Sequence, residues 1–147
     1  MRRFRFPLEP LRRLREHRER LEQVRAAQAR QALEEARARL EAEERVFHQT
    51  LQRGVAGSKL ALWQALHGYI LQEQQLLRQH RQSAAEAESR HAEAQRRLLW
   101  ARQERLVLDR LRERALAAYQ QELAQKEARQ LGEIALIQYG RRRRKGP

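Results

Sequence analysis

The first half of the chain repeats apolar residues at helical spacing. Between Leu11 and Gly54 there is no proline or glycine, and the apolar positions recur in steps of mostly three, seven and nine residues, which keeps them near one slowly drifting face of a helix. The nine-residue step that follows Val24 predicts a slip in the heptad register. Pro7 and Pro10 suit the start of a helix, so we predict a helix over about 10–53. The predicted stripe consists of Leu11, Leu14, Leu21, Val24, Leu33, Leu40, Phe47 and Leu51.

A second long helix is predicted over about 69–139, because this stretch has no proline and only one internal glycine, Gly132. The segment between the two helices, about 54–68, is predicted to be a break. Ser58 is expected to cap a short helix there that Gly68 ends, and the true turn lies either at 54–58 or at Gly68. The predicted stripe of the second helix consists of Leu76, Ala84, Ala87, His91, Ala94, Leu98, Ala101, Leu108 and Leu111, largely in heptad steps.

Neither helix is expected to be stable alone, because an isolated helix of about 70 residues gains too little from its backbone. The break lies near the middle of the chain, so the nearest partner for each helix is the other one. We therefore predict an all-α fold: a single long two-helix antiparallel coiled-coil hairpin over 1–147, with a short helical or irregular segment near its tip. A disordered basic tail is expected over about 140–147. The many alanines in both stripes predict close packing with a thin core.

The composition supports this fold, since 35% of the residues are charged and 5% are aromatic. The chain has no cysteine, no long apolar window and no apolar segment behind its basic start, so we expect a cytoplasmic protein. The net charge is +13, and ten of these charges come from residues 1–20 and 141–145. The hairpin would bring these two basic ends together, opposite the apolar tip around Trp63, Leu66 and Tyr69.

The sequence shows no arrangement of residues suited to catalysis. It contains no glycine-rich phosphate loop and no apolar stretch around a carboxylate that would shift its pKa. Glu88 and His91 have the E-x-x-H spacing of di-iron bundles, but such a site needs a second motif and further carboxylates. We therefore predict a protein that is not an enzyme and that has no cofactor, metal or small-molecule substrate.

The two ends of the chain resemble the FliJ family of the bacterial flagellar type III export apparatus. The opening Phe4-Arg5-Phe6-Pro7-Leu8-Glu9-Pro10-Leu11-Arg12-Arg13-Leu14-Arg15 resembles the start of that family. The stretch Glu127–Ala135 resembles its C-terminal signature, roughly E-Q-K-x-L-D-E-x-A, with Gly132 in place of the usual aspartate.

The resemblance implies a stalk-like coiled coil that binds and assembles the export ATPase ring. It also implies a link to the cytoplasmic domain of the membrane export gate and contact with export chaperones, at the inner membrane of the flagellar base. The residues implied for the ATPase are Phe4, Arg5, Leu8, Leu11, Arg12, Leu14, Glu127, Arg129, Leu131, Glu133 and Ile134. Those implied for the gate are Leu40, Phe47, Tyr69, Leu76 and His80.

Two alternatives remain at this stage. One is a basic coiled coil that binds nucleic acid through Arg141–Arg144; the scarcity of aromatic residues beside these arginines disfavours it, because single strands bind by stacking. The other is the equivalent stalk of a virulence injectisome or of a rotary ATPase.

Overall fold

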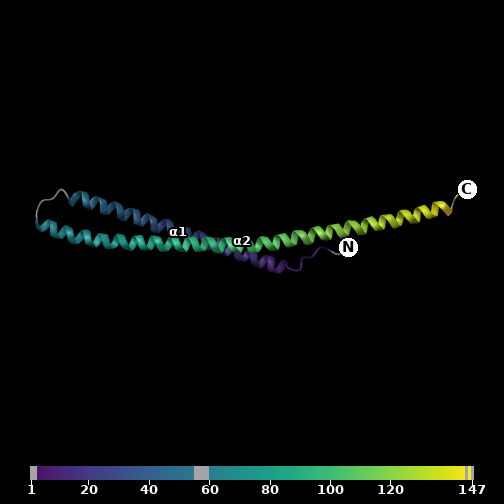
Figure 1. Ribbon diagram of the computed structural model, residues 1–147, viewed down its shortest axis with the longest axis horizontal. Coiled ribbons are helices and arrows are strands. Elements are labelled where there is room, and N and C mark those ends of the chain that lie inside the picture. Colours follow the sequence, from purple (N-terminus) through teal and green to yellow (C-terminus); the bar gives the residue numbers. More distant parts are fainter. Residues whose placement is uncertain (1–2, 55–59, 145, 147) are drawn as a thin grey trace. The chain divides into compact units, whose positions relative to one another are not determined.

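The computed structural model describes residues 3–54, 60–144 and 146. Helix α1 spans Glu9–Gly54 and helix α2 spans Leu60–Arg144, with 46 and 85 residues respectively (Figure 1). The described part of the chain contains no strand, and the two helices pack against each other. The predicted all-α, two-helix hairpin is therefore confirmed.

The start of α1 follows from local chemistry. Pro7 and Leu8 form a turn in which the Glu9 amide donates to the Phe6 carbonyl oxygen at 3.1 Å. The Arg12 amide donates to the Leu8 carbonyl oxygen at 2.9 Å and so closes the first helical turn. The Glu9 carboxylate lies in that turn, where the partial positive charge of the helix N-terminus favours an anion.

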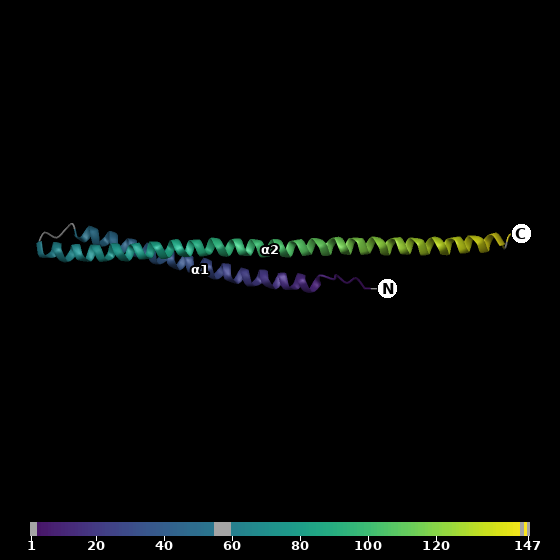
Figure 2. The same ribbon diagram turned by 60° about the horizontal axis from the view of Figure 1, so that its bottom comes forward.

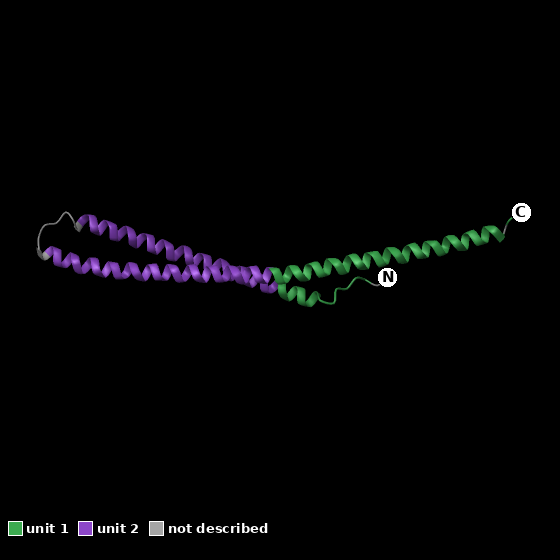
Figure 3. Cartoon of the chain, in the orientation of Figure 1, with its two compact units in different colours: residues 1–16, 103–147 green, residues 17–102 purple. Residues whose placement is uncertain are grey.

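By spatial contacts the chain forms two compact units (Figure 3). Unit 1 consists of residues 1–16 and 103–147, and unit 2 consists of residues 17–102. The prediction that the whole chain acts as one domain remains a prediction.

In unit 2 the helices run antiparallel, and the views in Figures 1 and 2 both show residues 17–54 and 60–102 side by side. As the residue number falls along α1, the number of its partner on α2 rises. The pairs are Thr50 with Glu73 at 3.4 Å, Glu44 with Arg81 at 3.7 Å and Arg37 with Glu88 at 3.3 Å.

The packed face of each helix in unit 2 follows an uninterrupted heptad, with buried or half-buried residues at alternating steps of three and four. Most of its best-buried apolar members are alanines, so the core is thin. On α1 these seam residues are Glu19, Glu22, Ala26, Ala29, Leu33, Ala36, Leu40, Glu43, Phe47 and Thr50. On α2 they are Ile70, Glu73, Leu77, His80, Ala84, Ala87, His91, Ala94, Leu98 and Ala101.

The predicted stripe of α1 is correct from Leu33 to Phe47 and wrong before and after these residues. Leu33, Leu40 and Phe47 lie in the seam, and there is no register slip before Leu33. The seam continues backward in strict heptads, because two helices stay in contact only if both keep the same period. It therefore passes through Ala26 and Glu19, and the following predicted residues are exposed: Leu11, Leu14, Leu21, Val24 and Leu51.

The predicted stripe of α2 is correct from Ala84 to Leu108. Before Ala84, the seam contains Leu77, which is 6% exposed, and not the predicted Leu76, which is 41% exposed. Leu111 is also exposed. Leu76 and Leu77 are adjacent leucines, so the sequence pattern does not distinguish them. Which of the two is buried in the seam depends on the register between α2 and α1.

The predicted bounds of the second helix differ from those observed. α2 begins at Leu60 and passes through Gly68, so no separate short helix ends there, and it continues to Arg144 instead of giving way to a disordered tail at 140. A glycine inside a helix costs only about 1 kcal/mol relative to alanine. Leu66 and Ile70, two residues before and after Gly68, are half-buried, and the burial of their side chains stabilises the helix there. The predicted cap, Ser58, lies outside the described residues.

Candidate protein-binding surfaces

Unit 1 joins the start of the chain to α2 through a group of charged residues. Arg12 donates to both carboxylate oxygens of Glu9, at 2.8 and 3.0 Å, and to Asp109 at 3.4 Å. Asp109 also accepts from Arg105 at 2.5 Å, and the guanidinium of Arg112 lies 3.6 Å from Glu9. Arg12 therefore bridges a carboxylate of its own helix and a carboxylate of α2.

The charge group shifts the ionisation of its members. The hydrogen bond from Arg12 is the largest cause that lowers the pKa of Glu9 from its ordinary 4.5 to about 2, and Arg13 and Arg112 contribute. The same hydrogen bond to Glu9 raises the pKa of Arg12 further above its ordinary value. Both groups stay charged throughout the physiological range. A second ion pair, Arg15 with Glu104 at 2.6 Å, continues the antiparallel order within unit 1.

An aromatic contact lies beyond the charge group. Phe4 and Tyr119 are half-buried, with ring centroids 5.6 Å apart and ring planes tilted by 48°. A shallow groove of about 420 Å³ lies beside this pair. Its lining includes Arg5, one of the residues implied for ATPase binding; the others are Arg3, Phe4, Phe6, Glu9, Arg13 and Arg112.

The N-terminal residues implied for ATPase binding fall into two kinds. Phe4 and Arg12 are engaged with α2, whereas Arg5, Leu8, Leu11 and Leu14 are exposed. Phe4 and Arg12 therefore hold the start of the chain in place, which their sequence motif did not reveal.

The C-terminal residues implied for ATPase binding lie on a different stretch of α2. Every described residue from 124 to 144 is exposed, whereas the contacts of residues 4–15 fall on α2 between Glu104 and Tyr119. The structure therefore does not bring the two predicted sets together. The exposed set includes Glu127, Arg129, Leu131, Glu133 and Ile134.

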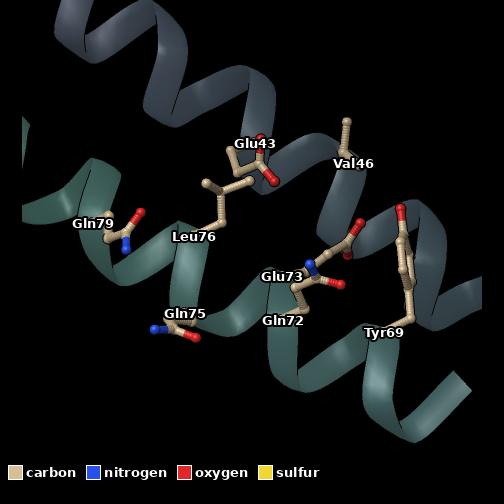
Figure 4. Close-up of a pocket in the computed structure, with 8 residues that line it drawn as sticks. All are labelled: Glu43, Val46, Tyr69, Gln72, Glu73, Gln75, Leu76 and Gln79. Carbon is tan, nitrogen blue, oxygen red and sulfur yellow. The ribbon is translucent and has the colours of Figure 1, made fainter.

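Unit 2 carries a groove of about 500 Å³ between the helices, shown in Figure 4. Two residues implied for gate binding, Tyr69 and Leu76, line it. Sequence reasoning missed its remaining lining residues, although Tyr69, Gln72, Leu76 and Gln79 share heptad-type spacing along one flank of α2. The missed residues are Glu43, Val46, Gln72, Glu73, Gln75 and Gln79.

Glu73 belongs both to the seam and to the lining of this groove. One of its carboxylate oxygens accepts from the Thr50 hydroxyl at 3.4 Å, and the other is buried with no hydrogen-bond partner among the described residues. Hydrogen bonding to Glu73 is the largest cause that raises the pKa of Tyr69, and the charge of the carboxylate adds to it. Figure 4 shows the Tyr69 ring and the Glu73 side chain both directed toward α1.

The other residues implied for gate binding are half-buried seam residues: Leu40, Phe47 and His80. The ring of Phe47 lies 6.3 Å from that of the exposed His48. These three side chains do not line the groove, and Tyr69 and Leu76 are the more exposed of the five residues implied for gate binding.

The E-x-x-H pair has no metal-like geometry around it. Glu88 is exposed and pairs with Arg37, while Nδ1 of His91 is buried with no hydrogen-bond partner in the described part of the chain. Among the described residues, no three histidine or carboxylate side chains gather into a group that could hold a metal ion. Within the same residues, no helix has a stretch apolar and long enough to cross a membrane.

The chain matches a known protein family. The family model described as "Flagellar FliJ protein" matches residues 4–144, nearly the whole chain. No curated protein and no solved structure matches the chain.

Proposed function

Because the chain belongs to the FliJ family of flagellar proteins, and so is a component of flagellar type III protein export, we propose that it acts as the stalk of the export ATPase. In this proposal it binds the ATPase ring, promotes ring assembly and links the ring to the export gate and to export chaperones. Its place would be the cytoplasmic face of the inner membrane, at the flagellar base. In this proposal the chain binds other proteins, and ATP is hydrolysed by the ATPase.

The last part of α2 carries this proposal. Residues 124–144 are exposed throughout, yet they include five large apolar side chains. Successive helical residues turn by about 100°, so Ile134 and Leu136 face nearly opposite sides, as do Ile137 and Tyr139. A helix that is apolar all round is normally buried on all sides. The five exposed residues are Leu131, Ile134, Leu136, Ile137 and Tyr139.

A ring with a central pore is the partner that fits such a segment. A flat surface or a single groove would cover only one side of the helix and leave Leu136 or Ile134 in water. A pore formed by several subunits surrounds the helix and buries apolar side chains in every direction. Four arginines, Arg141–Arg144, lie in the last turn of α2, where their charge would raise the rate of docking to an acidic pore.

The groove of unit 2 supports the link to the gate. Tyr69 and Leu76 are exposed two turns apart on α2, and the groove beside them is lined by glutamines, by Glu43 and Glu73 and by Val46. Exposed Tyr and Leu around a polar-walled groove provide an apolar anchor with hydrogen-bonding groups at its edge.

The test of the ATPase proposal is ATP hydrolysis by the cognate export ATPase, with and without this protein, near physiological salt. We expect stimulation together with more ATPase hexamer in size-exclusion chromatography. Leu131→Asp and Ile134→Asp are expected to weaken ATPase binding by about tenfold or more, because buried apolar anchors dominate such interfaces. Leu71→Asp is the matched control, since Leu71 is an equally exposed leucine of α2 outside the segment. Absence of stimulation and of co-elution for the unaltered protein would overturn the proposal.

The gate proposal has its own test. Tyr69→Ala and Leu76→Ala should lose binding to the purified cytoplasmic domain of the gate protein, measured by titration calorimetry, while ATPase stimulation stays unchanged. Leu71→Ala serves as the control. Unchanged binding of both groove variants would show that the gate contacts another surface.

A further inference from the structure

A second groove lies in unit 2, away from Tyr69 and Leu76, and it is rich in arginine. It has a volume of about 520 Å³ and is formed by both helices. A smaller neighbouring groove of about 180 Å³ shares Glu22, Arg25 and Arg97 with it. The lining of the larger groove is Arg18, Glu22 and Arg25 from α1, and Arg96, Arg97 and Trp100 from α2; the smaller one adds Arg90, Glu93 and Ala94.

Large apolar side chains are exposed beside these arginines. Trp100 is 62% exposed and Leu21 is 46% exposed, although each is next to a buried or half-buried seam residue. Trp100 lines the larger groove. Leu21 lines neither groove, but it lies three residues after Arg18 and four before Arg25, which places it on the same flank of α1. Trp is favoured at the centre of protein interfaces, so an exposed Trp beside a groove indicates a contact with another molecule.

The two grooves carry a net positive charge, which indicates the charge of the partner they would bind. Five arginines line them, against the two carboxylates of Glu22 and Glu93. Glu93 pairs with Arg97 at 2.5 Å, and one oxygen of Glu22 pairs with Arg25 at 2.8 Å while its other oxygen is buried with no hydrogen-bond partner among the described residues. The arginines still outnumber the carboxylates by three. A second copy of this chain would place arginine against arginine, which is unfavourable across an interface. An acidic partner is attracted instead.

The arginines repeat every seven residues on each helix, which indicates a helical partner. Arg18 and Arg25 are seven residues apart on α1, and Arg90 and Arg97 are seven residues apart on α2. Seven residues are two helical turns, a rise of about 10.5 Å. An acidic residue at every seventh position of a third helix would meet each row of arginines in turn. Amphipathic helices bind in this way in a groove between two helices.

We propose that this groove binds an acidic amphipathic helix of a partner protein. Apolar residues of that helix pack on Trp100 and Leu21. Its Asp or Glu residues pair with Arg96 and share Arg25 and Arg97 with Glu22 and Glu93, and Arg18 adds to the positive charge of the groove. The site does not depend on the proposed contact with the ATPase, because it lies outside residues 124–144 and outside the groove of Tyr69 and Leu76.

The test uses Trp100 as its own reporter in a full-length Trp63→Phe variant. The probe is a synthetic peptide of about three heptads with Leu at the a and d positions and Glu at the flanking positions. Its matched control carries Lys at every Glu position. We expect saturable binding of the Glu peptide with a blue shift of the Trp100 emission, weakened by added salt, and no such binding of the Lys peptide. Equal binding of both peptides, or no binding of the Glu peptide, would overturn the proposal.

Variants locate the binding on this groove. Trp100→Ala and Arg96→Glu are each expected to weaken binding of a fluorescein-labelled Glu peptide by about tenfold or more. Trp63→Ala and Arg102→Glu are the matched controls, because Trp63 and Arg102 are also exposed on α2 and line neither groove. Circular dichroism melting checks that each variant keeps its fold. If the control pair weakens binding as much as the groove pair, or if a single-stranded oligonucleotide displaces the peptide at lower concentration than the unlabelled peptide does, the site is not one for an acidic helix.

Discussion

The rings of Phe4 and Tyr119 lie with their centroids 5.6 Å apart, and this contact joins the stretch that precedes α1 to the second helix. Phe4 is separated from Glu9, the first residue of α1, by a turn at Pro7. The aromatic pair therefore holds a non-helical segment against α2.

Phe4→Ala should release this segment. Tilted aromatic pairs contribute about 0.5–1.5 kcal/mol beyond the area they bury, so the loss is expected to be local and small. Hydrogen exchange should become faster for the Glu9 and Arg12 amides, which donate to the carbonyl oxygens of Phe6 and Leu8, and the control Tyr119→Phe, which keeps the ring, should leave it unchanged. Unchanged exchange in Phe4→Ala would show that the charge group at Glu9 holds the segment alone.

Glu9 should make the stability of the protein depend on pH. Its pKa is lowered from 4.5 to about 2 in the folded chain, so the folded state favours the ionised form. The stabilisation is fully present above about pH 4.5 and is lost as the pH falls from there toward 2. Between pH 6 and pH 3, the melting temperature of Glu9→Gln should therefore fall less than that of the unaltered protein.

The matched control for Glu9 is Glu34→Gln, since the Glu34 carboxylate has one exposed ion pair, with Arg30 at 3.1 Å. Its melting temperature should follow that of the unaltered protein across this range. An NMR titration that finds Glu9 ionising near 4.5 would contradict the prediction directly.

Leu33→Ala should test the position of the seam. Leu33 is 5% exposed, and removing a buried leucine side chain costs about 2–5 kcal/mol, with the lower end expected in a two-helix core. Leu21→Ala is the control, because Leu21 lies outside the seam and exposed substitutions usually change stability by less than about 0.5 kcal/mol. Urea unfolding followed by circular dichroism measures both. A larger loss in Leu21→Ala would mean that the first predicted stripe is the packed one.

Glu73→Leu should stabilise the fold and alter the groove at the same time. One buried oxygen of Glu73 has no partner among the described residues, and burying such a group costs about 1–3 kcal/mol. A leucine at this seam position should therefore raise the free energy of unfolding by about 1–2 kcal/mol.

The same Glu73→Leu substitution removes the group that raises the pKa of Tyr69, so that pKa should fall toward its ordinary value. Ultraviolet titration of the tyrosines detects this shift. Gln79→Leu is the control, because Gln79 lines the same groove from an exposed position. A less stable Glu73→Leu variant would show that the hydrogen bonds of Glu73 with Thr50 and Tyr69 outweigh the cost of burial.

Much of the fold could be predicted from the sequence because it depends on local properties. Helices form where proline and glycine are absent, and the proline pair at Pro7 and Pro10 marks the start of α1. The antiparallel pairing follows from a break near mid-chain. Leu33, Leu40 and Phe47, and Ala84 to Leu108, could be placed in the seam because their own heptad spacing already agrees with the spacing of the partner helix.

The tertiary structure decided what local spacing leaves ambiguous. The first half of α1 has two candidate faces, one with Leu14 and Leu21 and one with Glu19 and Ala26. The face with Leu14 and Leu21 is the more apolar one, yet it is exposed. The reason is that both helices keep the same heptad register from Thr50 back toward the N-terminus, and this register places the other face in the seam. The same constraint leaves Trp100 beside the arginine groove. It also leaves every described residue from 124 to 144 exposed, beyond the contact of Phe4 with Tyr119. Which apolar residues are covered is thus a property of the register between two helices, which neither helix specifies alone.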